Sequence, residues 1–118
     1  MLQFEYSWQE ILGTVKVLGA SYTTDSNDRV VVSANINVNH GSNLAPAAII
    51  IATYTTRGGL RVITGAHVIP NTYLSSGINE FPTNITEQSG DEVALFIWDN
   101  LTDMNPLHCR IWAERETQ

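Results

Sequence analysis

Hydrophobic and polar residues alternate with a period of two along residues 30–39, which read VVVSANINVN. Five apolar side chains fall on one face of an extended chain, namely Val30, Val32, Ala34, Ile36 and Val38. The opposite face carries mostly serine and asparagine. Because this period is typical of a strand with one buried side, we predict a half-buried strand that ends at the turn residues 40–43.

A second pattern predicts a β-hairpin. Residues 47–57 (AAIIIATYTTR) and 60–69 (LRVITGAHVI) are rich in β-branched side chains and flank Gly58-Gly59. Paired glycines adopt the positive φ angles that a tight hairpin turn requires. We therefore expect two antiparallel strands joined at these glycines, with Pro70-Asn71 closing the second strand.

Shorter apolar runs predict the remaining strands, at residues 13–22, 78–85, 91–98 and 107–113. The run at 91–98 ends apolar on both faces, as a central strand would. Only residues 6–12 have a helical pattern, with Ser7 as a candidate cap. About seven strands of this size need a second layer to cover their apolar face, so we predict an all-antiparallel β-sandwich. Residues 1–118 form one domain, with 1–12 as a candidate N-terminal extension.

Charge narrows the classes of partner. The net charge is −6, Lys16 is the only lysine, and the five arginines are scattered along the sequence. Binding to nucleic acid needs a row of cations, so no nucleic-acid partner is expected, and anionic membrane surfaces are disfavoured for the same reason. No apolar run is long enough for a membrane span, so we predict no membrane insertion. Protein partners and neutral ligands such as glycans stay compatible with this charge.

Cysteine content bears on location. Cys109 is the only cysteine, which excludes an internal disulfide. A low content of charged residues, 15%, together with abundant Asn, Thr and Ser, is typical of secreted β-rich domains. The start MLQFEYSWQE lacks the basic and apolar regions of a signal peptide. These observations leave two interpretations open, a cytoplasmic protein or a mature piece or excised module of a longer protein, although the absence of disulfides fits bacterial export better than eukaryotic secretion.

Two stretches together resemble a known class of module. The first is APAAIIIATYTTRGGLRVIT, in which the matching residues are Ala52, Tyr54, Gly58 or Gly59, and Leu60. The second is DEVALFIWDNLTDMNPL, where the matching residues are Val93, Phe96, Trp98, Asp99, Leu101, Met104, Pro106 and Leu107. This pattern, over about residues 30–107, is similar to immunoglobulin-like or fibronectin-like modules of secreted multimodular bacterial proteins. The chain departs from it by continuing with HCRIWAERETQ, and its first twenty residues are not covered.

The resemblance implies an immunoglobulin-like β-sandwich, a place outside the cell or on its surface, and no catalytic residue. From the residues themselves, Trp98-Asp99 has two readings. In the first, Phe96 and Trp98 are buried on one face of a core strand, and Asp99 starts a turn by accepting backbone N–H bonds. In the second, Trp98 is a sugar platform beside a carboxylate. We favour the first.

The polar and titratable residues do not have the spacing of a known metal site or catalytic site. Asp99, Asn100, Asp103 and Asn105 supply four oxygen-bearing side chains, but their spacing is not that of a known calcium loop. His40, His67 and His108 lie in separate segments and have no ligand spacing. His108 and Cys109 would point to opposite faces of a strand, so we expect Cys109 to be a small buried hydrophobe. We predict no metal, no cofactor and no enzyme activity.

Trp112 is the strongest candidate for ligand contact. On the predicted strand it shares the polar face with His108 and Arg110, so an exposed indole there needs an explanation. Two hypotheses follow. The favoured one is a non-catalytic accessory module that acts as a spacer or packs against neighbouring domains or other proteins. The alternative is a carbohydrate-binding module that stacks sugars on Trp112, with Tyr73 and Trp8 as supporting rings.

Overall fold

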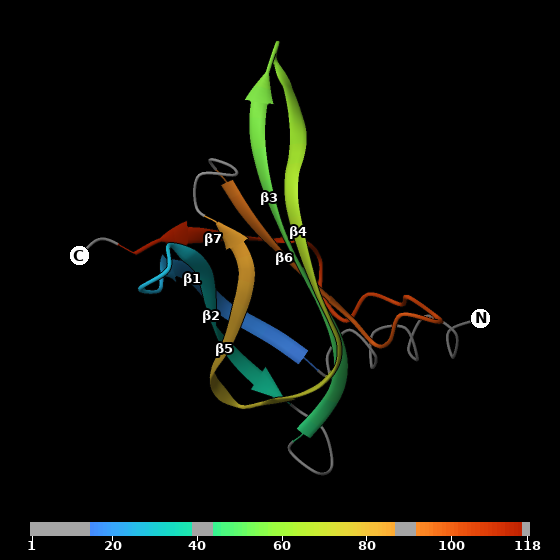
Figure 1. Ribbon diagram of the computed structural model, residues 1–118. Helices are drawn as coiled ribbons and strands as arrows, with labels where there is room; N and C mark the ends of the chain where they lie inside the picture. Colours follow the sequence, from blue (N-terminus) through green and yellow to red (C-terminus); the bar gives the residue numbers. More distant parts are fainter. Residues whose placement is uncertain (1–14, 39–43, 87–91, 117–118) are drawn as a thin grey trace.

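The chain folds as an all-β domain of seven strands in the computed structural model, which describes residues 15–38, 44–86 and 92–116 (Figure 1). Trp8, His40, the candidate extension 1–12 and the predicted helical turn lie outside the described residues. The strands are β1 (Val15–Thr24), β2 (Arg29–Val38), β3 (Leu44–Arg57), β4 (Leu60–Ser75), β5 (Gly77–Thr86), β6 (Glu92–Trp98) and β7 (Ile111–Arg115).

The strands form one mixed, barrel-like sheet in the order β4-β3-β6-β7-β1-β2-β5. All pairings are antiparallel except that of β1 with β7, which run parallel through Ser21–Glu114 and Tyr22–Arg115. The prediction of seven strands is therefore confirmed, whereas the prediction that every pairing is antiparallel is wrong. The correction has a simple cause, because β7 lies between β6 and β1 and joins what would otherwise be two separate sheets.

Side chains bring the two edge strands together and nearly close the barrel. The Nδ1 atom of His67 on β4 lies 3.0 Å from Oδ1 of Asn84 on β5. Closer to the turn between these strands, the Ser76 hydroxyl accepts a hydrogen bond from the backbone N–H of Val38 on β2 at 2.9 Å. An edge that is covered in this way offers less unpaired backbone to other chains.

The core lies on the inner side of this sheet, and β2 supplies the predicted face. Val30, Val32, Ala34, Ile36 and Val38 are all buried and belong to the core cluster. The alternation read from the sequence is thus confirmed residue by residue.

The aromatic residues of β6 correct a second prediction. Leu95 and Ile97 are fully buried and face the core, whereas Phe96 and Trp98 are half-buried on the other side of the sheet. Phe96 and Trp98 are therefore outer-face residues rather than core residues. The position of β6 between β3 and β7, central as predicted, explains why both of its faces are apolar.

Strand ends also differ from the prediction. β4 continues through Pro70 to Ser75 instead of ending there. Proline is tolerated because β4 is an edge strand, and the pairing with β3 shifts register between Ala47 and Ile49. The last predicted strand, residues 107–113, begins later than expected. β7 starts at Ile111, so residues 107–110 are not part of it.

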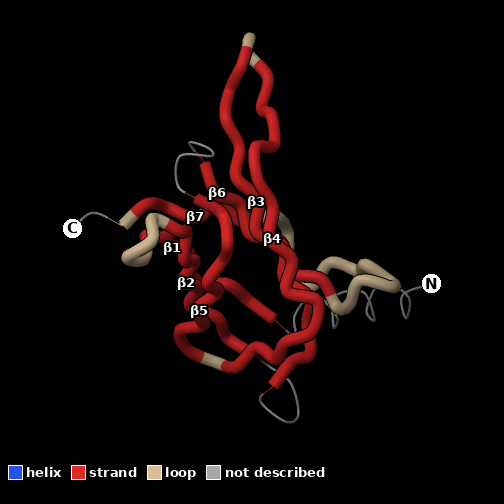
Figure 2. The backbone as a smooth tube through the Cα atoms, in the orientation of Figure 1, coloured by secondary structure: helices blue, strands red, loops and turns tan. Residues whose placement is uncertain are grey.

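The hairpin of β3 and β4 extends beyond the body of the domain (Figure 2). Gly58 and Gly59 have φ angles of 58° and 83°, as a primed turn requires, which confirms the predicted hairpin. Pairing between β3 and β6 ends at Tyr54–Glu92. Among the described residues, 55–63, called the arm here, pair only with each other and with Tyr54.

A buried threonine ties β5 to β2 where the ladder between them shifts register, between Arg29 and Val31. The Thr83 hydroxyl donates to the Val30 carbonyl at 2.8 Å and accepts the N–H of Ile85 at 3.1 Å. Replacing Thr83 by valine is expected to lower the free energy of unfolding by about 1–3 kcal/mol, because both backbone groups lose this partner. Urea unfolding measures the change. Thr83→Ser keeps the hydroxyl and should recover most of the loss, and a Thr83→Val variant as stable as the parent would contradict this role.

Candidate functional site

Trp112 lies on the outer face of the sheet, as predicted, but its ring is already in contact with other side chains. Tyr54 packs edge-on against it, with ring centroids 5.5 Å apart and an interplanar angle of 69°. The guanidinium carbons of Arg61 and Arg110 each lie 4.6 Å from the ring centroid. Trp112 is therefore half-buried by its neighbours and is not an open stacking platform.

Arg61 also forms an ion pair that fixes the base of the arm. Its Nε lies 2.8 Å from Oε1 of Glu92, and its Nη2 lies 3.1 Å from Oε2. The hydrogen bond from Arg61 lowers the pKa of Glu92 and raises that of Arg61 itself. Since Arg61 is on β4 and Glu92 on β6, this contact spans β3. Together with Tyr54, Arg110 and Trp112, these two residues form what we call the Trp112 cluster.

Sequence reasoning missed this cluster. Arg61 and Arg110 are far apart in the sequence, and the arginines looked scattered, yet the sheet order brings both to one indole ring. The outward position of Trp112 was the one signal available, since an exposed tryptophan needs a covering partner. The sequence did not indicate which residues would cover it.

Tyr73 is highly exposed and lies elsewhere on the surface. It pairs with Pro46 on β3, whereas Trp112 lies in the row of Ala52 and Ala94. Six residues along β3 correspond to about 20 Å, so Tyr73 and Trp112 do not share one platform.

Tyr73 lines a hollow of about 330 Å³ between β3, β4 and the loop that follows β6. The other polar residues of this hollow are Asn71, Thr72, Asp99 and Asn100. An aromatic ring beside amide and hydroxyl groups is a combination that suits a sugar. This geometry relates Tyr73, and not Trp112, to the glycan-binding hypothesis.

Asp99 organises the loop after β6, as the structural reading of Trp98-Asp99 predicted. Its Oδ1 accepts the backbone N–H groups of Asn100 at 2.7 Å and Asn105 at 2.9 Å, and its Oδ2 accepts the Asn105 amide at 3.0 Å. Pro106 pairs with Trp98 in an isolated bridge, and Met104 takes a positive φ of 54°. Asp99, Met104 and Pro106 are thus structural residues of one turn.

The pKa of Asp99 predicts acid sensitivity. Partial burial raises this pKa, but the hydrogen bonds from Asn105 and Asn100 outweigh it, so the pKa lies below its ordinary 3.8. Because the pKa of Asp99 is lower in the folded state than in the unfolded state, its ionised form stabilises the fold at pH values above the unfolded-state pKa. This stabilisation is lost as the pH falls through the folded-state pKa. We expect the unfolding temperature to fall below about pH 4.

Thermal unfolding followed by circular dichroism between pH 7 and pH 3 tests this sign. Asp99→Asn places an amide N–H₂ against the Asn105 amide and removes the titrating group. The variant should be less stable than the parent at pH 7, and the difference should shrink as the pH falls. A difference that is constant or grows in acid would contradict the assignment.

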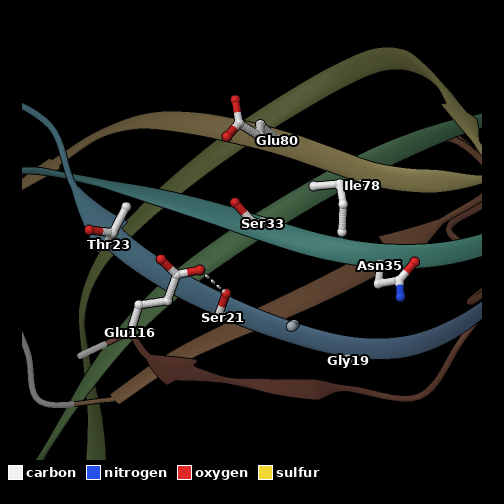
Figure 3. Close-up of a pocket in the computed structure, with 9 residues that line it drawn as sticks. Gly19, Ser21, Thr23, Ser33, Asn35, Ile78, Glu80 and Glu116 are labelled. Carbon is white, nitrogen blue, oxygen red and sulfur yellow. Dashed lines mark hydrogen bonds between the residues drawn. The ribbon is translucent and has the colours of Figure 1, made fainter. Parts of the chain in front are cut away.

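A second hollow lies on the outer face of β1, β2 and β5 (Figure 3). It has a volume of about 500 Å³ and we call it the trough. Its floor is made of rows that pair across the three strands, Gly19–Asn35–Ile78 and Ser21–Ser33–Glu80. Because glycine and serine are small, the floor lies low between the longer side chains.

Two glutamates lie beside the trough floor. Glu80 extends from β5, and Glu116 accepts a hydrogen bond from the Ser21 hydroxyl at 2.7 Å (Figure 3). Ile78 is also largely exposed here. No sequence pattern predicted this surface, because its residues come from four separate segments.

His108 and Cys109 also differ from the prediction. Cys109 is exposed rather than buried, and its Sγ lies 3.6 Å from Nδ1 of His108. The expectation of opposite faces is wrong because both residues precede β7 and strand alternation does not apply to them. Neither residue lines the trough or the Tyr73 hollow.

Within residues 15–38, 44–86 and 92–116, no three His, Cys, Asp or Glu side chains come together as a metal site would require. None of these residues belongs to a helix long and apolar enough to cross a membrane. The chain matches no protein-family model, and comparisons with curated proteins and with solved structures find no match either.

Proposed function

We propose that this chain is a non-catalytic interaction module of an exported bacterial protein, and that its arm contacts a neighbouring domain or another protein. The observation that carries the proposal is the exposure of three apolar side chains on the arm, which is 71% for Leu60, 59% for Ile63 and 37% for Val62. Such a group on a projecting element is typical of a protein-binding surface.

The register explains why Leu60 and Val62 are exposed among the residues that the structure describes. Val62 and Leu60 lie opposite Thr55 and Arg57, on the strand face that carries Ile49 and Ile51 into the core further along β3. The arm therefore continues the apolar inner face beyond the body of the domain. The exposed apolar side chains follow from the length of β3 and β4.

The arm is built to hold its shape. A two-stranded ribbon alone is marginally stable in water, but here the Arg61–Glu92 pair and the Trp112 ring hold its base. A register shift at Thr53 is fixed by the Thr53 and Thr64 hydroxyls, 3.0 Å apart. A preorganised arm loses less conformational entropy on binding than a flexible loop does.

We further propose that the fold is a variant of the immunoglobulin-like β-sandwich, and the strand order supports this. If the sheet is divided at the short β1–β7 pairing, β1-β2-β5 and β4-β3-β6-β7 become its two halves. The chain then crosses from one half to the other after β2, β4 and β5, as it crosses between the two sheets of an immunoglobulin-like sandwich. Modules of this kind connect or present domains in larger secreted proteins, which supports a location outside the cell or on its surface.

Site-specific photo-crosslinking tests the role of the arm. A photo-reactive amino acid replaces Leu60 in one variant and Tyr73, exposed but distant from the arm, in a control variant. We expect position 60 to form a discrete protein crosslink in the producing cells that excess parent domain suppresses, and position 73 to form none. Equal crosslinking from both positions, or none from position 60, would refute the proposal. Leu60→Asp should keep its unfolding temperature, because exposed substitutions change stability little.

The second candidate function is carbohydrate binding, favoured by the hollow beside the exposed Tyr73. Affinity electrophoresis on soluble polysaccharides tests it. If this function is correct, a polymer retards the parent, Tyr73→Ala abolishes the retardation, and Leu60→Asp preserves it. Free migration of the parent in every gel would exclude glycan binding for the polymers used.

A further inference from the structure

From the charges and shapes of two surfaces, we infer that the partner of the arm is a second copy of this chain, whose trough receives the arm. This inference rests on the proposed function, because it names the partner of the same surface. The contact is head-to-tail, since the arm and the trough are different surfaces of one molecule. Such contacts build rings or open chains of copies.

The first argument is charge complementarity. Residues 55–63 contain Arg57 and Arg61 and no acidic residue. Arg61 is paired with Glu92, so the positive charge that the arm offers to a partner is that of the exposed Arg57, in a chain of net charge −6. The trough is lined by Glu80 and Glu116 and by no cationic residue. A cationic arm and an anionic trough attract each other and fix the orientation in which two copies meet.

The second argument is the apolar content of both surfaces. The arm presents Leu60 and Val62 on one face, and the trough presents Ile78, which is 67% exposed. Contact between the two would remove these side chains from water, which is favourable in proportion to the area buried.

The third argument is space. A Cβ atom built on Gly19 would have no heavy atom within 4 Å, and the neighbouring floor residues Ser21 and Ser33 are small. The arm projects from the body of the domain, so its turn is the part of the molecule that reaches furthest toward another copy (Figure 1). Within one molecule the arm leaves the body beyond the β3–β6 pairing, whereas the trough lies on β1, β2 and β5.

Sedimentation velocity of the intact chain tests the inference, from about 10 µM to about 1 mM, because a small interface of this kind is weak. We expect the parent to grow beyond the monomer as its concentration rises, and to do so less at high salt. Arg57→Glu and Glu80→Arg should each remain monomeric. Arg57 is chosen instead of Arg61 because it is not part of the Trp112 cluster. Tyr73→Ser, which changes no residue of the arm and none that lines the trough, should associate like the parent.

Mixing the two charge variants gives the decisive result. In an equimolar mixture, the intact arm of Glu80→Arg can enter the intact trough of Arg57→Glu, and the acidic arm of Arg57→Glu is complementary to the basic trough of Glu80→Arg. The mixture should therefore recover association although each variant alone is monomeric. Circular dichroism confirms that both variants are folded.

Three results would overturn the inference, namely a monomeric parent at every concentration, unchanged association of either charge variant, or a mixture that stays monomeric. The proposed function is judged separately by the crosslink from position 60. If the parent is monomeric and position 60 still crosslinks to a different protein, self-association fails and the interaction module stands. If the crosslink is also absent, both fail.

Discussion

Replacing Leu95 by alanine is expected to lower the free energy of unfolding by about 2–5 kcal/mol, the range for truncating a fully buried leucine. Leu95 has no exposed surface and lies in the core cluster on β6, paired with Ile51 on β3 and Ile111 on β7. The loss combines the apolar contacts of the side chain with the cavity that remains. Chemical unfolding in urea, with the slope compared between variant and parent, measures it.

Phe96→Ala is the matched control for this prediction. Phe96 is the larger side chain, but it is half-buried on the outer face, so its truncation should destabilise the fold less than Leu95→Ala does. An equal or larger loss for Phe96→Ala would show that the aromatic face of β6 is the core side.

Trp112→Ala is expected to cost about 2–3 kcal/mol, below the range for a fully buried tryptophan because the ring is only half-buried. The substitution removes the edge contact with Tyr54 and the surface on which Arg61 and Arg110 stack. Both are net stabilising interactions. The loss should be concentrated at the base of the arm.

Hydrogen exchange separates this structural role from ligand binding. In Trp112→Ala, amide protection should fall in residues 55–63 and stay near parental values in β2. Affinity electrophoresis of the same variant adds a second readout. Retardation of the parent on a polysaccharide that is lost in Trp112→Ala, with the arm's protection intact, would assign Trp112 to sugar stacking after all.

Local patterns in the sequence were enough to predict strands that expose one face to solvent, and strands that a characteristic turn sequence joins. The alternation of β2 identified its buried side chains correctly, and Gly58-Gly59 located the hairpin. Each signal depends on neighbouring residues alone. Asp99 belongs to the same class, because a short carboxylate followed by turn residues predicts the hydrogen bonds that the loop shows.

The wrong predictions concern properties that depend on sheet order. β6 is apolar on both faces, so its sequence could not indicate that Leu95 instead of Phe96 faces the core. Pro70 ends a central strand but not an edge strand, and the edge position of β4 follows only from the pairing. Trp112, Arg61 and Glu92 come together for the same reason, through pairings between distant segments.

The position of β7 has a consequence for how the domain matures. β7 follows the other six described strands in the sequence, yet it is the one that links β4-β3-β6 to β1-β2-β5. During synthesis, both halves are complete before residues 111–115 leave the ribosome, but nothing yet joins their ladders. The two halves of the nascent chain would thus stay unjoined by backbone pairing until residues 111–115 arrive.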